Sequence, residues 1–110
     1  FNIILTDVED EIKLPTEFAL MQNYPNPFNP TTTISYQLPV SSNVTLKIFD
    51  VLGNEVAILL DEYKTAGIYN EKFTMNNLSS GIYFYQLKVI DPESGSGQVF
   101  VQTKKMILMK

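Results

Sequence analysis

The sequence predicts an all-β domain in which two antiparallel sheets enclose one core. Apolar and polar residues alternate along most of the chain with the period of two that turns one face of a strand inward. Turn-forming residues interrupt the alternation roughly every ten residues, as in β-sandwiches. The turns are short, whereas parallel strands need long crossover connections, so antiparallel pairing is expected.

The first candidate strand, residues 18–22, is short and apolar. It ends at residues 23–30, which contain three prolines that fix φ and offer no N–H group to a sheet. We expect this segment to run across the surface as an extended or turning strap. Tyr24 and Phe28 are expected to pack over an open end of the sandwich and so prevent edge pairing.

The next two candidate strands, residues 33–38 and 44–48, alternate apolar with polar residues. Residues 50–54 begin with Asp and include Gly53, a combination typical of a tight turn with one residue at positive φ. This turn should lead into a fourth strand at residues 55–60.

The last three strands are predicted at residues 68–75, 82–90 and 99–109. The sixth has the strongest pattern, with Tyr83, Tyr85, Leu87 and Val89 on one face and Phe84 among the residues of the other. Its length and the apolar residues on both faces suggest a central position. Residues 91–97 are typical of a hairpin loop. The final strand should lie at an edge, with an irregularity near Thr103.

Seven strands in this arrangement predict an immunoglobulin-like or fibronectin type III-like β-sandwich. Residues 16–110 are expected to form this domain. Residues 1–15 hold a short apolar run and an acidic stretch, which we interpret as the end of a preceding domain and a linker.

Composition excludes several function classes. The chain has no cysteine and no histidine, so it lacks thiolate ligands and the side chain most used for proton transfer near neutral pH. We therefore expect no enzyme, no metal site and no cofactor. Asp91 and Glu93 fall short of the six to eight oxygens that calcium gathers. Arginine is absent and residues 18–110 carry seven acids and seven lysines, which disfavours a nucleic-acid partner.

Ordered blocks across residues 16–110 resemble the type A C-terminal sorting domains of the type IX secretion system, which are similar to the immunoglobulin-like module of flagellar hook-capping proteins. The matching blocks are residues 20–30 (LMQNYPNPFNP), 33–39, 44–50 with Gly53, 66–69 (AGIY), 78–87 (LSSGIYFYQL) and 104–110 (KKMILMK). The resemblance implies a non-catalytic label that directs an attached cargo across the outer membrane of a Gram-negative bacterium of the Bacteroidota or a related phylum.

Such a label implies passage through the periplasm to the cell surface or the medium. The implied partners are an outer-membrane translocon, a shuttle barrel and a surface sortase that removes the domain, together with an upstream cargo domain. A weak homodimer through an edge strand would also fit the fold.

Two segments are candidates for recognition. The stronger is the tail, because an apolar edge strand with charged ends can be bound by strand addition or pocket insertion. As plain structure, its lysines would guard an aggregation-prone strand. The tail comprises Lys104, Lys105, Met106, Ile107, Leu108, Met109 and Lys110. The second is the strap, comprising Tyr24, Pro25, Asn26, Pro27, Phe28, Asn29 and Pro30, for which packing is the main alternative role.

The principal rival function is a carbohydrate-binding or adhesive sandwich in a secreted enzyme. It is motivated by the thirteen aromatic residues and by the fold class, although the chain has no tryptophan for a sugar-stacking platform. The aromatic row Tyr83, Phe84 and Tyr85 could stack on a sugar if it lay on an exposed strand face. Packing of these rings in the core and at its rim is the alternative. Fold class cannot separate the two functions.

Overall fold

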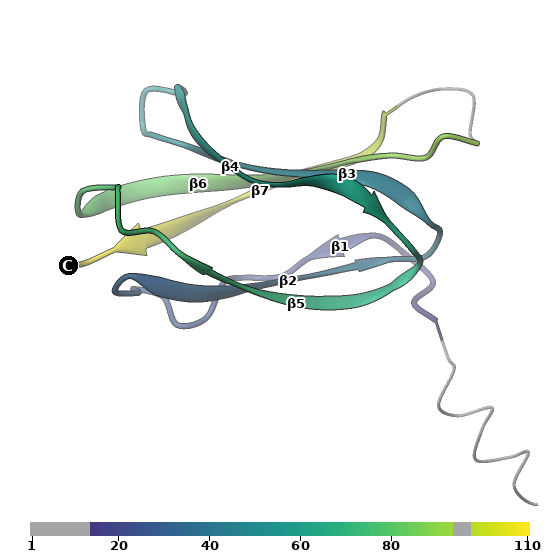
Figure 1. Cartoon of the computed structure of the whole chain (residues 1–110), viewed down its shortest axis with the longest axis horizontal. Helices are drawn as coiled ribbons and strands as arrows, with labels where there is room; N and C mark the ends of the chain where they lie inside the picture. The colour runs from purple at the N-terminus through teal and green to yellow at the C-terminus, as the bar shows by residue number, and fades with distance from the viewer. Residues whose placement is uncertain (1–13, 94–97) are drawn as a thin grey trace, which may run out of the picture.

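The computed structural model describes residues 14–93 and 98–110, in which seven strands form two antiparallel sheets packed face to face (Figure 1). Residues 1–13 of the expected domain end and linker lie outside the described residues. Residues 94–97 of the expected hairpin loop also lie outside them. Among the described residues no helix could cross a membrane. The strands are β1 (Ala19–Leu20), β2 (Thr31–Leu38), β3 (Ser42–Phe49), β4 (Glu55–Lys64), β5 (Gly67–Thr74), β6 (Gly81–Ile90) and β7 (Gln98–Leu108).

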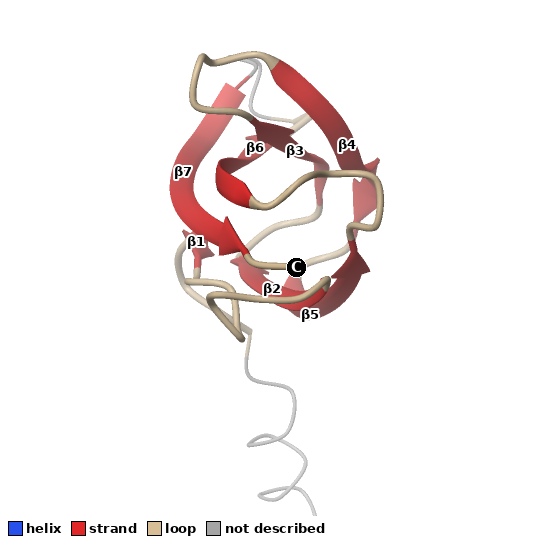
Figure 2. Ribbon diagram, turned by 90° about the vertical axis from the view of Figure 1, so that its left-hand side faces the viewer, coloured by secondary structure: helices blue, strands red, loops and turns tan. Residues whose placement is uncertain are grey.

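The strand orders are β1-β2-β5 in one sheet and β4-β3-β6-β7 in the other, which confirms the predicted sandwich. The fourth strand pairs with the third, as in fibronectin type III domains, and not with the fifth, as in constant-type immunoglobulin domains. The short turn between β4 and β5 therefore carries the chain from one sheet to the other. β4 and β5 form one side of the sandwich, and β1 and β7 form the other (Figure 2).

The core lies between the sheets, where period-two alternation has placed the apolar residues of each strand. β2 and β6 contribute fully buried tyrosines, Tyr36 and Tyr85, together with branched aliphatic side chains. β6 lies between β3 and β7, as its pattern predicts. Each fully buried large apolar side chain contributes ~1.5–3 kcal/mol relative to exposure, so a core of this size can hold a disulfide-free domain together.

The β3–β4 hairpin turns as its sequence predicts. The Asp50 carboxylate accepts hydrogen bonds from the amides of Leu52 and Asn54, both at 2.9 Å. The hydrogen bond from the Asn54 amide is the main cause that lowers the pKa of Asp50. Gly53 has a φ angle of 88°, a backbone conformation that residues with a Cβ atom rarely adopt.

The two other turn glycines behave differently from Gly53. Gly67 and Gly81 begin β5 and β6, and each opens a Gly-Ile-Tyr triplet. The tyrosine of each triplet donates a hydrogen bond to the carbonyl oxygen four residues earlier: Tyr69 to Thr65 and Tyr83 to Ser79, both at 2.7 Å. The second contact has the position and geometry of the tyrosine corner of immunoglobulin-like domains.

The expectation of an irregularity near Thr103 is wrong. The β6–β7 ladder is continuous through Gln86↔Thr103 and changes register only between Val89↔Phe100 and Ile90↔Gln98. β4 carries two further irregularities against β3, one near Leu59 and one near Val56. Bulges of this kind disfavour pairing of an edge strand with another chain.

Candidate recognition site

The strap begins at a buried asparagine that sequence reasoning missed. Asn23 is 2% exposed, and its backbone N–H donates to the Tyr85 hydroxyl at 2.8 Å. Its side-chain amide donates to the Thr32 hydroxyl at 3.0 Å and to the Pro25 carbonyl at 3.2 Å. The Tyr85 hydroxyl in turn donates to the Met21 carbonyl at 2.7 Å. These hydrogen bonds hold the backbone at the start of the strap in place, because a buried polar group without a partner costs free energy.

Burial also acts on the tyrosine at the centre of this network. Removal of the Tyr85 ring from water raises the pKa of its hydroxyl to about 12, against a smaller lowering by the hydrogen bond from Asn23. The hydroxyl is therefore neutral at physiological pH and can both accept from Asn23 and donate to Met21.

The two aromatic residues of the strap have opposite environments. Phe28 is 2% exposed and belongs to the core, as expected. Tyr24 is 79% exposed, so the expectation that it packs over the sandwich is wrong. Its backbone forms a two-way bridge to Thr33, with N···O distances of 3.0 and 2.8 Å, which directs the ring away from the core into solvent. The peptide bonds before Pro25, Pro27 and Pro30 are cis.

The strap and the tail, far apart in sequence, lie side by side. The Phe28 N–H donates to the Ile107 carbonyl and the Met109 N–H donates to the Phe28 carbonyl, both at 2.9 Å, in a parallel bridge centred on Leu108. The Asn26 side-chain oxygen accepts from the Ile107 N–H at 2.8 Å. The two candidate segments therefore form one surface.

A fourth contact lies just before the strap, where the Gln22 side-chain amide donates to the Lys105 carbonyl at 2.8 Å. β7 is an edge strand, as predicted, but its outward backbone groups between Lys105 and Met109 are already largely occupied. In this conformation strand addition at the tail is blocked, because an added strand needs those same groups.

Side chains of the tail alternate between core and solvent. Met106 and Leu108 are fully buried, whereas Lys105, Met109 and Lys110 are exposed. Lys104 and Ile107 are half-buried. A partner that meets the folded domain can therefore contact only part of the predicted segment.

The last residue is held by the β5–β6 loop. The Lys110 N–H donates to the Ser80 hydroxyl at 2.9 Å, and its ammonium group donates to the Asn76 carbonyl at 2.6 Å. Both contacts are solvent-exposed, so this lysine remains accessible at the end of the sandwich.

The aromatic row does not form an exposed platform. Tyr83 and Tyr85 are buried on the inner face of β6, and only Phe84 lies on the outer face, half-buried. This favours the packing role for the row.

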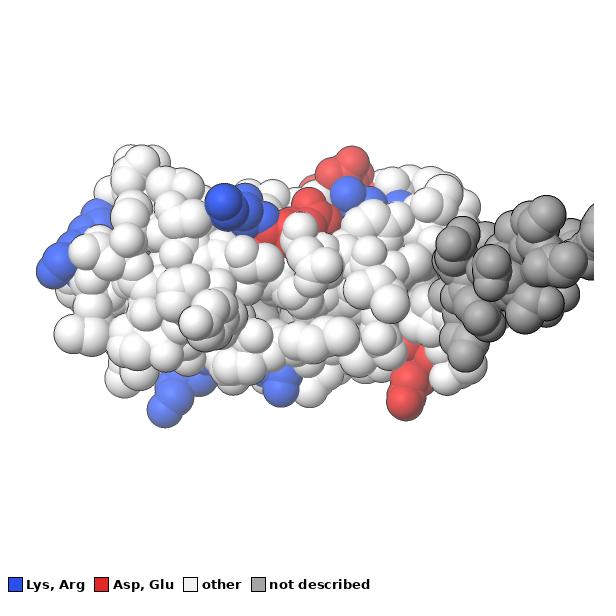
Figure 3. Space-filling model, turned by 90° about the horizontal axis from the view of Figure 1, so that it is seen from below, with Lys and Arg blue, Asp and Glu red and all other residues white. Residues whose placement is uncertain are grey.

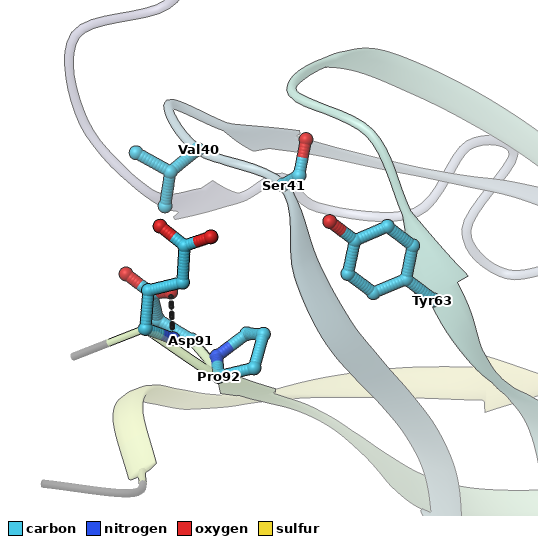
Figure 4. A pocket seen from close by; sticks show the side chains of 6 residues that line it. Val40, Ser41, Tyr63, Asp91 and Pro92 are labelled. Atoms are coloured by element: carbon cyan, nitrogen blue, oxygen red, sulfur yellow. Dashed lines mark hydrogen bonds between the residues drawn. The ribbon is translucent and has the colours of Figure 1, made fainter. Parts of the chain in front are cut away.

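A pocket of about 370 Å³ lies at one end of the sandwich, between Tyr63, Val40, Ser41 and the loop after β6 (Figure 4). Asp91 and Glu93 both line it, and the Asp91 carboxylate accepts a hydrogen bond from the Glu93 N–H at 2.9 Å. In residues 14–93 and 98–110, no group of three or more acidic side chains is placed to hold a metal ion.

Comparison with solved structures supports the class of fold. The crystal structure of dimeric latent PorU from Porphyromonas gingivalis contains a region that superposes with a TM-score of 0.67 at 21% identity. The alignment covers 86% of this chain and 10% of that protein. The shared feature is the sandwich. No curated protein sequence matches the chain.

The sequence profile of the family described as "Secretion system C-terminal sorting domain" matches residues 22–108, and the chain belongs to this family. The match includes all of the strap and nearly all of the tail. The chain is thus a secretion signal of the type IX system, destined for the cell surface or the exterior. Domains of this family are in general non-catalytic.

Proposed function

We propose that the secretion machinery recognises the surface where strap and tail meet, and not the tail as a free strand. In this proposal the partners are an outer-membrane translocon and a shuttle barrel, which meet the domain after it has entered the periplasm with its upstream cargo. A surface sortase then removes the domain. The four hydrogen bonds that join residues 22–28 to residues 105–109 carry the proposal.

The accessible part of this surface has a definite chemistry. Tyr24, Asn26 and Pro27 are exposed on the strap, and Lys105, Met109 and Lys110 are exposed on the tail. Aromatic and methionine side chains bring apolar contact, and the two lysines bring positive charge. A rigid surface of this kind loses little conformational entropy on binding.

The test is export of a reporter fused before residues 1–110 and behind a signal peptide, in a bacterium that has this secretion system. Deleting residues 104–110 would remove two core side chains, so it cannot separate recognition from folding. Lys105→Glu and Lys110→Glu keep the core intact, and we expect either change to reduce the exported fraction several-fold.

The matched control is Lys88→Glu on β6, which makes the same charge change away from the strap. We expect it to be exported normally. Thermal unfolding of all three variants checks that folding is unchanged. Normal export of both tail variants would refute recognition through this surface, and an exported reporter that keeps the full mass of the domain would refute removal by a sortase.

A further inference from the structure

The side of the sandwich opposite the strap contains an unpaired sheet edge. The N–H of Met75 donates to the carbonyl of Pro30 at 2.9 Å, which fixes the phase of the β2–β5 ladder. In an antiparallel ladder hydrogen-bonded pairs alternate, so the backbone groups of every second residue of β5 point away from β2. These residues are Ile68, Asn70, Lys72 and Thr74.

No hydrogen-bond partner exists for these four N–H and C=O pairs within the described part of the chain. Their side chains are exposed as well, and β5 pairs with β2 without any register shift. The neighbouring edge strand β4 differs, because its two irregularities disrupt the spacing that another strand would need. β5 is therefore the longest regular free edge in the described residues.

A groove lies beside one end of this edge, between the two sheets. It has a volume of about 150 Å³ and is lined by Val56, Ala57 and Leu59 of β4 and by residues 74–78, which include the polar Asn76 and Asn77. Apolar cavities of about this size accept a benzene ring, so the groove has room for one aliphatic or aromatic side chain. The inward side chains of a strand added to β5 near Thr74 would point toward it.

The charge on the outer face of β5 indicates which kind of segment could pair with its edge. Few charged side chains interrupt the face of the three-stranded sheet (Figure 3). Lys72 lies in the middle of the free edge and forms no ion pair within the described residues. An acidic residue opposite Lys72 would be favourable in a cross-strand pair.

The β5 strand of a second copy does not supply that acid. Two β5 strands paired about a two-fold axis would face Lys72 with Ile68, Asn70, Thr74 or another Lys72, because the outer face of β5 has no acidic residue. An extended segment of a different protein, with apolar residues on one face and an acid on the other, would supply the acid.

We propose that the free edge of β5 binds such a segment by strand addition, independently of recognition at the strap and tail. The probe is a capped seven-residue peptide with the sequence Thr-Val-Thr-Val-Glu-Val-Thr, titrated into the isotope-labelled chain. We expect saturable changes of amide chemical shift at Ile68, Asn70, Lys72 and Thr74, and smaller changes at the groove residues of β4.

Three variants test the mode of binding. Asn70→Pro removes an outward N–H without breaking the β2–β5 ladder, and we expect it to bind the peptide about tenfold more weakly. Asn70→Ala keeps the N–H, and we expect its affinity for the peptide to stay within about twofold of that of the unchanged chain. Lys72→Glu should reverse the preference, binding a peptide with Lys in place of Glu about two- to fivefold better than the original.

Any of three results would overturn the proposal. Absence of saturation up to about 5 mM peptide would exclude a usable site. Equal binding to Asn70→Pro and Asn70→Ala, with both spectra showing the native fold, would exclude strand addition. Concentration-dependent broadening of the β5 amides without peptide, together with a dimer in sedimentation velocity, would identify a second copy as the occupant.

Discussion

The side chain of Asn23 supports the strap from inside the core. We expect Asn23→Ala to lower the free energy of unfolding by about 1–3 kcal/mol, because the Pro25 carbonyl loses a partner and the Thr32 hydroxyl loses a donor in a buried site. Urea titration measures this loss. Asn26→Ala is the control, since its single bond to the tail is exposed and should contribute less. Equal losses would mean that burial at Asn23 does not matter.

The buried tyrosines predict a loss of stability at alkaline pH. Burial raises the pKa of Tyr36, further raised by its hydrogen bond to Glu71, and raises that of Tyr85 to about 12. Because the ordinary tyrosine value is 10.0, the folded state holds these protons more tightly than the unfolded state. The stabilisation is complete below pH 10 and declines as pH rises above 10, by about 1.4 kcal/mol per pH unit for each group.

Measuring the free energy of unfolding between about pH 9 and 12 checks this alkaline loss of stability, because Tyr85 loses its stabilising contribution over that range. Tyr85→Phe should be less stable at neutral pH, because it loses the bonds to Asn23 and Met21, and its stability should fall less steeply with pH. Parallel curves for the two proteins would show that Tyr85 does not carry the alkaline loss.

At the scale of elements, the β3–β4 hairpin depends on backbone conformation. Gly53→Ala meets no atom within 4 Å, so its cost comes from φ of 88° alone and should be about 1 kcal/mol. Gly81→Ala is the matched control, because its φ is ordinary and the new Cβ would lie 3.9 Å from the Tyr83 ring. We expect no loss of stability for Gly81→Ala in thermal or urea unfolding. Equal losses would contradict the conformational account.

The elements also show what alternation can and cannot predict. The alternation predicted for the strand from Tyr83 to Val89 is confirmed, and its apolar odd-numbered face is the buried one, because burial on one face leaves a direct trace in the sequence. The exposure of Tyr24 and the burial of Asn23 left no such trace, because both depend on backbone and side-chain hydrogen bonds formed with distant segments. The passage between sheets after Lys64 was missed for a similar reason, since a short turn can join strands of one sheet or of two.

At the scale of the whole molecule, the sandwich has two unlike sides. On one side the strap occupies the end of the β7 edge, and on the other no described residue pairs with the edge of β5. The tail and the strap were predicted separately as recognition segments, but their union was not predictable because it depends on long-range contacts.

Amide hydrogen exchange of the intact chain tests this union most directly. The N–H groups of Ile107 and Met109 point away from β6 but bond to Asn26 and Phe28 of the strap. Those of Val101 and Thr103 point outward on the same strand and have no partner among residues 14–93 and 98–110. We expect Ile107 and Met109 to be protected strongly and Val101 and Thr103 to exchange rapidly. Rapid exchange at all four positions would show that the strap does not hold the tail.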